Sequence, residues 1–136
     1  MKMLNEWSEW LTLDAGTLND AASSIPKKSV YLIRSRRAFS RVFGVSPLVY
    51  IGAVEGNSNR STSQRMNGLV AQNNPPHTAF NGIQKLLKLG ETLEFCVWQS
   101  ELPDPEAVKA SLLCFYEKIH LELPPLNHQR GAKNDP

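Results

Sequence analysis

The sequence predicts an α+β domain with a small three-stranded antiparallel sheet flanked by helices. Three features lead to this prediction: two early runs of β-branched and aromatic residues, a later alternating strand, and a long final helix with a clear start signal. The chain has 136 residues, of which 41% are apolar and 21% are charged. That length buries enough surface for one core without disulfides or a structural metal.

The first two strands are expected at residues 30–34 and 48–54. The runs VYLIR and LVYIGAV are bounded by turn residues, which is typical of paired antiparallel strands. The connection between them is expected to be a basic loop. It holds Arg36, Arg37 and Arg41.

Two helices are expected next. Ser61 or Thr62 can cap the first, and the second begins near residues 75–78 and ends at Gly90. Both have apolar residues at helical spacing: Met66, Leu69 and Val70 in the first, and Phe80, Ile83 and Leu87 in the second.

A third strand with period-two alternation is expected at residues 93–98, and a final helix follows it. The segment Asp104-Pro105-Glu106 combines an N-cap, a proline in the first turn and an acid near the positive helix end. The helix is expected to run to about Leu121 and to stop before two prolines. Its core stripe is expected to comprise Val108, Leu112, Phe115 and Ile119.

Glu117 lies on the far side of that helix, inside a second apolar sector. Two interpretations stay open for it. The carboxylate can pair with His120 one turn later, or it can face a cleft as a metal ligand or acid–base group.

The predicted organisation has three parts: an N-terminal extension at 1–28, a domain at 29–130 and a flexible tail at 131–136. The extension is expected to form a short amphipathic helix, because Leu4, Trp7, Trp10 and Leu11 recur at helical spacing. The first residues lack an export signal and no run is long enough to cross a bilayer, so a cytoplasmic protein without membrane contact is expected. Two cysteines outside metal spacing are then expected to be reduced core thiols.

The net charge of +2 hides an uneven distribution. Residues 21–54 contain six basic residues and no acidic residue. Such a local field suits a polyanion such as nucleic acid, although solvated surface cations would give the same pattern.

Several motifs occur in order along the chain. Ser29-Val30-Tyr31 lies on the first strand and Tyr50-Ile51-Gly52 on the second. An arginine on the next helix, Glu117 on the last helix and Asn127 shortly after Pro-Pro-Leu follow. In this respect the chain resembles the GIY-YIG nuclease superfamily, whose members cut phosphodiester bonds. The resemblance spans residues 29–127.

The resemblance implies roles for individual residues. Tyr31 and Tyr50 would face the scissile phosphate, and Gly52 would let the backbone approach closely. Glu117 would hold a single Mg²⁺ or Mn²⁺, and Asn127 would help to frame the site. The catalytic arginine would be Arg60 by spacing or Arg65 by its place on a helix; we favour Arg65, because a catalytic group needs a rigid support.

The function implied is a metal-dependent endonuclease that hydrolyses double-stranded or branched DNA. Tyr31 would take a proton from the attacking water, which requires its pKa to fall from about 10. A homodimer would allow one site per chain to cut both strands. Backbone contacts are expected from Gly52 and from the basic residues Arg34, Arg36, Arg37, Arg41 and Arg60.

Two other classes stay open. One is a catalytically inactive nucleic-acid-binding module with the same fold. The other is a protein-interaction domain that uses the face carrying Trp7 and Trp10.

Overall fold

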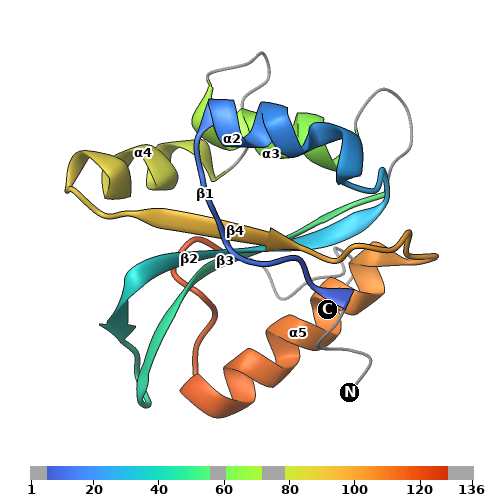
Figure 1. Ribbon diagram of the computed structural model, residues 1–136. Helices are drawn as coiled ribbons and strands as arrows, with labels where there is room; N and C mark the ends of the chain where they lie inside the picture. The colour runs from blue at the N-terminus through green and yellow to red at the C-terminus, as the bar shows by residue number, and fades with distance from the viewer. Residues whose placement is uncertain (1–5, 56–60, 72–78, 129–136) are drawn as a thin grey trace.

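The computed structural model describes residues 6–55, 61–71 and 79–128. It confirms the α+β class and contains a four-stranded antiparallel sheet in the order β1-β4-β2-β3, one strand more than expected. The strands are β1 (Leu11–Thr12), β2 (Ser29–Ser40), β3 (Val45–Val54) and β4 (Leu93–Val97). Helices α2, α3 and α4 cover one face of the sheet and α5 covers the other (Figure 1).

Strands β2 and β3 form a hairpin that is longer than the sequence indicated. Pairing continues to Ser40 and Val45, with irregularities in register on either side of Arg34. Gly44, at φ 76°, closes the short turn, a backbone conformation that favours glycine. The expected basic loop is therefore wrong, because Arg36 and Arg37 belong to β2.

From Trp7 onward the described part of the N-terminal segment pairs with β4, so Trp7, Trp10 and Leu11 do not share the expected amphipathic helix; Leu4 lies outside the described residues. Trp7 bridges to Trp98, and the Ser8 N–H donates to the Val97 carbonyl over 2.8 Å. Strand β1 then continues this pairing along β4. A helix this short has little stability of its own. The hydrogen bonds gained by pairing with the free edge of β4 therefore favour the extended conformation over a helix.

The helices on the first face begin at clear caps. In α2 (Ala15–Ala21), which precedes a 3-10 turn at Ala22–Ser24, the Asp14 side chain accepts from the Thr17 N–H. Helix α3 (Thr62–Val70) begins after Ser61, one of the two candidate caps, which forms a capping box with Gln64. Helix α4 (Phe80–Lys88) begins later than the expected residues 75–78, and Gly90 follows it at φ 90°. Buried side chains from these helices pack on the sheet: Leu18, Met66, Leu69 and Ile83.

Helix α5 (Pro105–His120) has the predicted start, with Asp104 as N-cap, but a different buried side. Leu113 and Tyr116 are buried, whereas Phe115 is 66% exposed and Ile119 is 45% exposed. The expected core stripe is thus wrong in its C-terminal half. The sheet meets the sector that contains Leu113, which is the sector next to Glu117.

Both cysteines are free, but only one belongs to the core. Cys96 is buried, and its burial raises the pKa of the thiol to about 12. Cys114 is exposed on α5, contrary to expectation. Among the described residues, no helix is both long enough and apolar enough to cross a membrane.

Candidate functional site

The two candidate tyrosines are neighbours on the sheet face that α2, α3 and α4 cover. Tyr31 on β2 lies opposite Gly52 on β3, and Tyr50 lies opposite Ile33. The two phenol rings are 6.1 Å apart between centroids. A Cβ added to Gly52 would lie 2.2 Å from the Tyr31 ring carbon that carries the hydroxyl. Any residue larger than glycine at position 52 would therefore overlap the phenol of Tyr31.

Burial shapes the chemistry of Tyr31. Its side chain is only 1% exposed, and the loss of solvation raises its pKa well above the ordinary value of 10. The Coulombic interaction and the hydrogen bond with Tyr50 raise this pKa further. The lowered pKa of Tyr31 that the sequence led us to expect is therefore wrong. In the protein without metal or DNA, the Tyr31 phenol is protonated at neutral pH.

Two charged side chains lie within electrostatic reach of the Tyr31 hydroxyl. Arg65 on α3 favours the phenolate and lowers the Tyr31 pKa, whereas Glu106 in the first turn of α5 raises it. The Glu106 N–H donates to the carboxylate of Glu55, just after β3. Arg65 thus has the position that the sequence favoured, while Arg60 lies outside the described residues.

Asn127 attaches the C-terminal segment to β3 at the position between Tyr50 and Gly52. Its Oδ1 accepts from the Ile51 N–H over 2.9 Å, and its Nδ2 donates to the Ile51 carbonyl over 3.0 Å. The residue is 8% exposed. Both ends of the amide are therefore engaged, so Asn127 holds the backbone beside the tyrosines in place.

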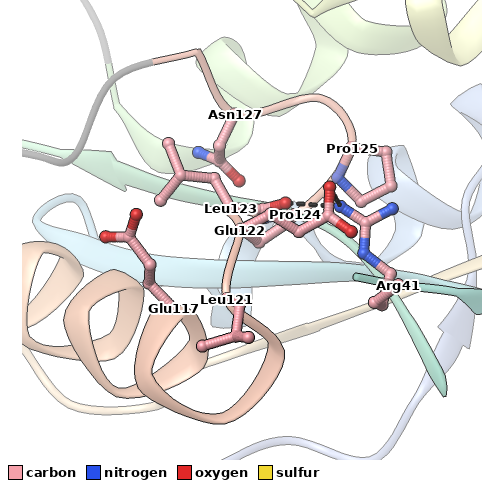
Figure 2. Close-up of a pocket in the computed structure, with 8 residues that line it drawn as sticks. All are labelled: Arg41, Glu117, Leu121, Glu122, Leu123, Pro124, Pro125 and Asn127. Atoms are coloured by element: carbon pink, nitrogen blue, oxygen red, sulfur yellow. Dashed lines mark hydrogen bonds and ion pairs between the residues drawn. The ribbon is translucent and has the colours of Figure 1, made fainter. Parts of the chain in front are cut away.

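Glu117 lies in an open pocket of about 490 Å³ on the α5 side of the sheet (Figure 2). Asn127 lines the same pocket, together with Arg41 and residues 121–125. Glu117 and Asn127 thus line one pocket. The tyrosines and Arg65 do not line it, because the tyrosines face α2, α3 and α4 on the other side of the sheet, so the five candidate side chains do not share a single pocket.

Arg41 was expected to contact phosphate, but its side chain turns into the protein and is 11% exposed. One guanidinium nitrogen donates to the Leu123 carbonyl over 2.6 Å and lies 3.1 Å from the Glu122 carboxylate. These contacts hold residues 121–127 against the hairpin. Sequence reasoning missed this role, because the pairing joins residues about eighty positions apart.

The pocket can be tested for its fit to a divalent cation. Within the described ranges, no group of three or more His, Cys, Asp or Glu side chains could hold a metal ion. Mg²⁺, however, usually keeps several waters and takes one or two protein carboxylates together with substrate phosphate. Glu117, half-exposed in an open pocket, is compatible with that mode. Glu122 in the same pocket binds Arg41 and accepts from the Val42 N–H.

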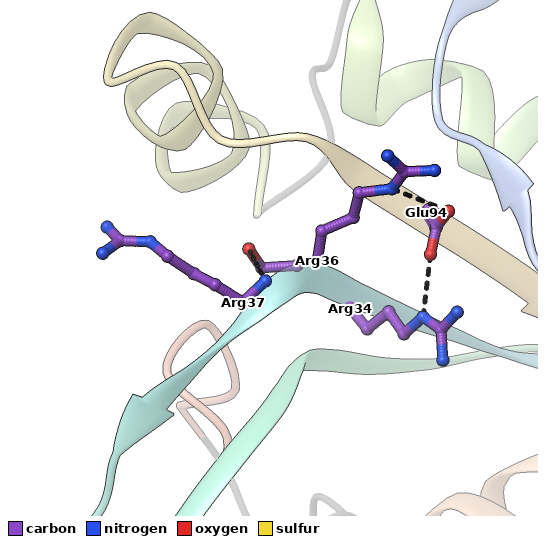
Figure 3. A network of polar contacts seen from close by, with 5 residues as sticks. Arg34, Arg36, Arg37 and Glu94 are labelled. Carbon is purple, nitrogen blue, oxygen red and sulfur yellow. Dashed lines mark hydrogen bonds and ion pairs between the residues drawn. The ribbon is translucent and has the colours of Figure 1, made fainter.

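The remaining basic residues of β2 face acids from a distant part of the sequence (Figure 3). Arg34 and Arg36 share Glu94, at 2.9 and 3.5 Å, and Arg37 binds Glu91. These contacts lower the pKa of both carboxyl groups. Arg36 and Arg37 still expose about seven tenths of their side chains, so they can reach a partner from solvent.

The two tryptophans proposed for protein recognition are also engaged within the fold. Trp7 packs edge-on against Trp98 at 5.3 Å, and the Arg34 guanidinium lies 4.0 Å above the ring of Trp10. Both side chains are only partly exposed.

No protein-family model, curated protein or solved structure matches this chain.

Proposed function

We propose that the protein is a GIY-YIG-like, metal-dependent endonuclease that hydrolyses DNA phosphodiester bonds. The observation that carries the proposal is the position of Asn127. Its amide pairs with Ile51, in the middle of the Tyr50-Ile51-Gly52 motif, while its own pocket contains Glu117. This amide therefore joins the backbone of the motif on β3 to the pocket that contains Glu117.

In this proposal Glu117 would hold Mg²⁺ or Mn²⁺, with waters and a substrate phosphate as its other ligands. When bound, the ion would supply positive charge for the phosphate and would lower the pKa of a coordinated water. Arg65 would add a guanidinium that can contact phosphate oxygens in a bidentate manner. Arg36 and Arg37, exposed on β2, would contact the DNA backbone.

Tyr31 needs a different role from the one that the sequence suggested. With a pKa well above 10, it is a hydrogen-bond donor at neutral pH and a poor proton acceptor. We therefore propose that Tyr31 and Tyr50 support strand β3 beside the site and do not supply the base, since both side chains are buried.

A plasmid-nicking assay with added Mg²⁺ or Mn²⁺ tests the proposal. Glu117→Ala should lose several orders of magnitude in rate, because phosphodiester hydrolysis needs a large reduction of its barrier. Lys118→Ala is the control on the same helix, since this exposed neighbour of Glu117 has no role in the proposal. Equal cleavage by wild type and Glu117→Ala would exclude Glu117 from the mechanism.

A second candidate function is a nucleic-acid-binding module without catalysis. The burial of Tyr31 favours it, because a side chain that is 1% exposed does not reach a phosphate in this conformation. A salt-sensitive gel shift, with no cleavage under Mg²⁺ or Mn²⁺, would support this function. For both candidate functions, we propose DNA as the partner and the cytoplasm as the location of the protein.

A further inference from the structure

Exposed large apolar side chains gather at one end of the molecule. In the described residues, the turn of the β2–β3 hairpin and the end of α5 contribute six of them. We call these the hairpin-end surface: Val42, Phe43, Val45, Phe115, Ile119 and Leu121.

Backbone contacts join the two parts of this surface. The Phe43 N–H donates to the His120 carbonyl over 3.1 Å, and His120 Nδ1 lies 2.8 Å from the Phe43 carbonyl. Gly44 lies against the same imidazole, since a Cβ there would be 3.6 Å from Nδ1. Figure 1 places the hairpin turn beside the C-terminal end of α5. A main-chain hydrogen bond and the His120 ring therefore hold the two parts together, and neither contact needs the apolar side chains of the surface.

The exposed area of the hairpin-end surface approaches the area that one partner buries in a protein interface. Its six residues are between 45% and 67% exposed. A large aliphatic or aromatic residue has roughly 150–200 Å² of accessible area, so the six leave roughly 600 Å² in contact with water. That value is at the upper end for a monomer's largest apolar patch, and it approaches the roughly 800 Å² per partner of a standard interface.

We propose that the hairpin-end surface binds a second copy of this chain in a two-fold symmetric dimer. Interfaces between identical chains are more apolar than transient ones, and this surface consists of apolar residues from both elements. In a two-fold arrangement, Phe43 of one copy would pack on Phe115 of the other, and symmetry would repeat this contact. The area argument and the composition together favour this occupant over a nucleic acid, which would require cations at the centre.

The dimer would also place two candidate sites near one another. Leu121 belongs to the hairpin-end surface and lines the pocket that contains Glu117. This consequence, unlike dimerisation itself, rests on the proposed nuclease function. It would let a pair of chains cut both strands of a duplex.

Sedimentation velocity of the full chain over a range of micromolar concentrations tests the dimer without DNA. The wild type should dimerise, and the double variant Phe43→Glu/Phe115→Glu should weaken the dimer by about 100-fold or more, since it would bury unpaired charges. Leu89→Glu is the matched control: Leu89 is 76% exposed but lies at the end of α4, outside the surface. Circular dichroism and the melting temperature would verify that each variant is folded, and Ile119→Lys provides a second variant.

A wild-type protein that stays monomeric at the highest concentration would overturn the proposal, as would equal association of wild type and both surface variants. A monomeric wild type whose surface variants lose DNA affinity would assign the surface to nucleic acid and would also overturn it. In a nuclease assay, monomeric variants should nick plasmids without linearising them. Absence of any cleavage would reject the nuclease proposal and leave the sedimentation result unaffected.

Discussion

The amide of Asn127 is expected to be a major determinant of stability, and Asn127→Ala tests this. The side chain forms hydrogen bonds with both the N–H and the carbonyl of Ile51, 76 residues earlier in the chain. Alanine would remove both bonds and leave two polar backbone groups without partners in a site where Asn127 is 8% exposed.

The magnitude follows from the number of groups that lose a partner. Each buried polar group left unsatisfied costs roughly 1–3 kcal/mol, and water entering the vacated space recovers part of that cost. We therefore expect the free energy of unfolding to fall by about 2–4 kcal/mol, which is a large fraction of the total for a domain of this size.

Urea denaturation followed by far-UV circular dichroism would measure the change in the free energy of unfolding. The control is His128→Ala, at the next position, where the side chain is exposed and little change is expected. A loss below about 0.5 kcal/mol for Asn127→Ala would refute the reasoning, because the pairing with Ile51 would then make no net contribution.

Three further predictions concern the sheet. Gly52→Ala should destabilise the protein by about 1–3 kcal/mol or more in thermal unfolding, since its Cβ would overlap the Tyr31 ring, whereas Gly16→Ala in α2 meets only ordinary contacts and should be neutral or stabilising. Tyr31 has a pKa above its unfolded value, so the folded state holds this proton more tightly. Stability should therefore fall as the pH rises above about 10, and Tyr31→Phe should reduce that fall in urea titrations at alkaline pH. Glu94→Gln should free the guanidinium groups that it now binds and tighten DNA binding a few-fold at low salt; unchanged affinity in a gel shift would exclude those groups from the DNA contact.

Elements with strong local signals were predictable from the sequence. The hydroxyl side chains at 61 and 62 predicted the start of α3 to within one residue, and Asp104-Pro105 predicted the start of α5. The alternation in residues 93–98 likewise gave β4. These signals depend on residues within one turn of each other, so no tertiary information is needed to interpret them.

Features that depend on distant contacts were not predictable in the same way. Trp7 and its neighbours follow β4 because that strand offers an edge about ninety residues later. The sector of α5 that is buried depends on how the helix meets the sheet, so Phe115 was assigned to the core although it is exposed. Helical periodicity identifies candidate stripes, but only packing selects between them.

The candidate site also contains both predictable and unpredictable contacts. The order of the motifs suggested that Glu117 and Asn127 lie near each other, and they line one pocket. No local pattern indicated that Arg34 would bind Glu94, sixty residues away. A segment without acids therefore looked like a polyanion surface, whereas the fold supplies the counter-charges from β4 and from the turn before it. Charge counted along the chain and charge in space can differ for this reason.

The attachment of residues 126 and 127 to β3 also has a consequence for self-association. Strand β3 is the last strand of the sheet, and its outer main-chain groups would otherwise be open to a strand from another molecule. The Leu126 N–H donates to the Val49 carbonyl over 2.9 Å, and the Asn127 side chain binds both polar backbone groups of Ile51. Pro47 has no N–H to donate. These contacts leave fewer groups of β3 open to pairing with a strand of another molecule.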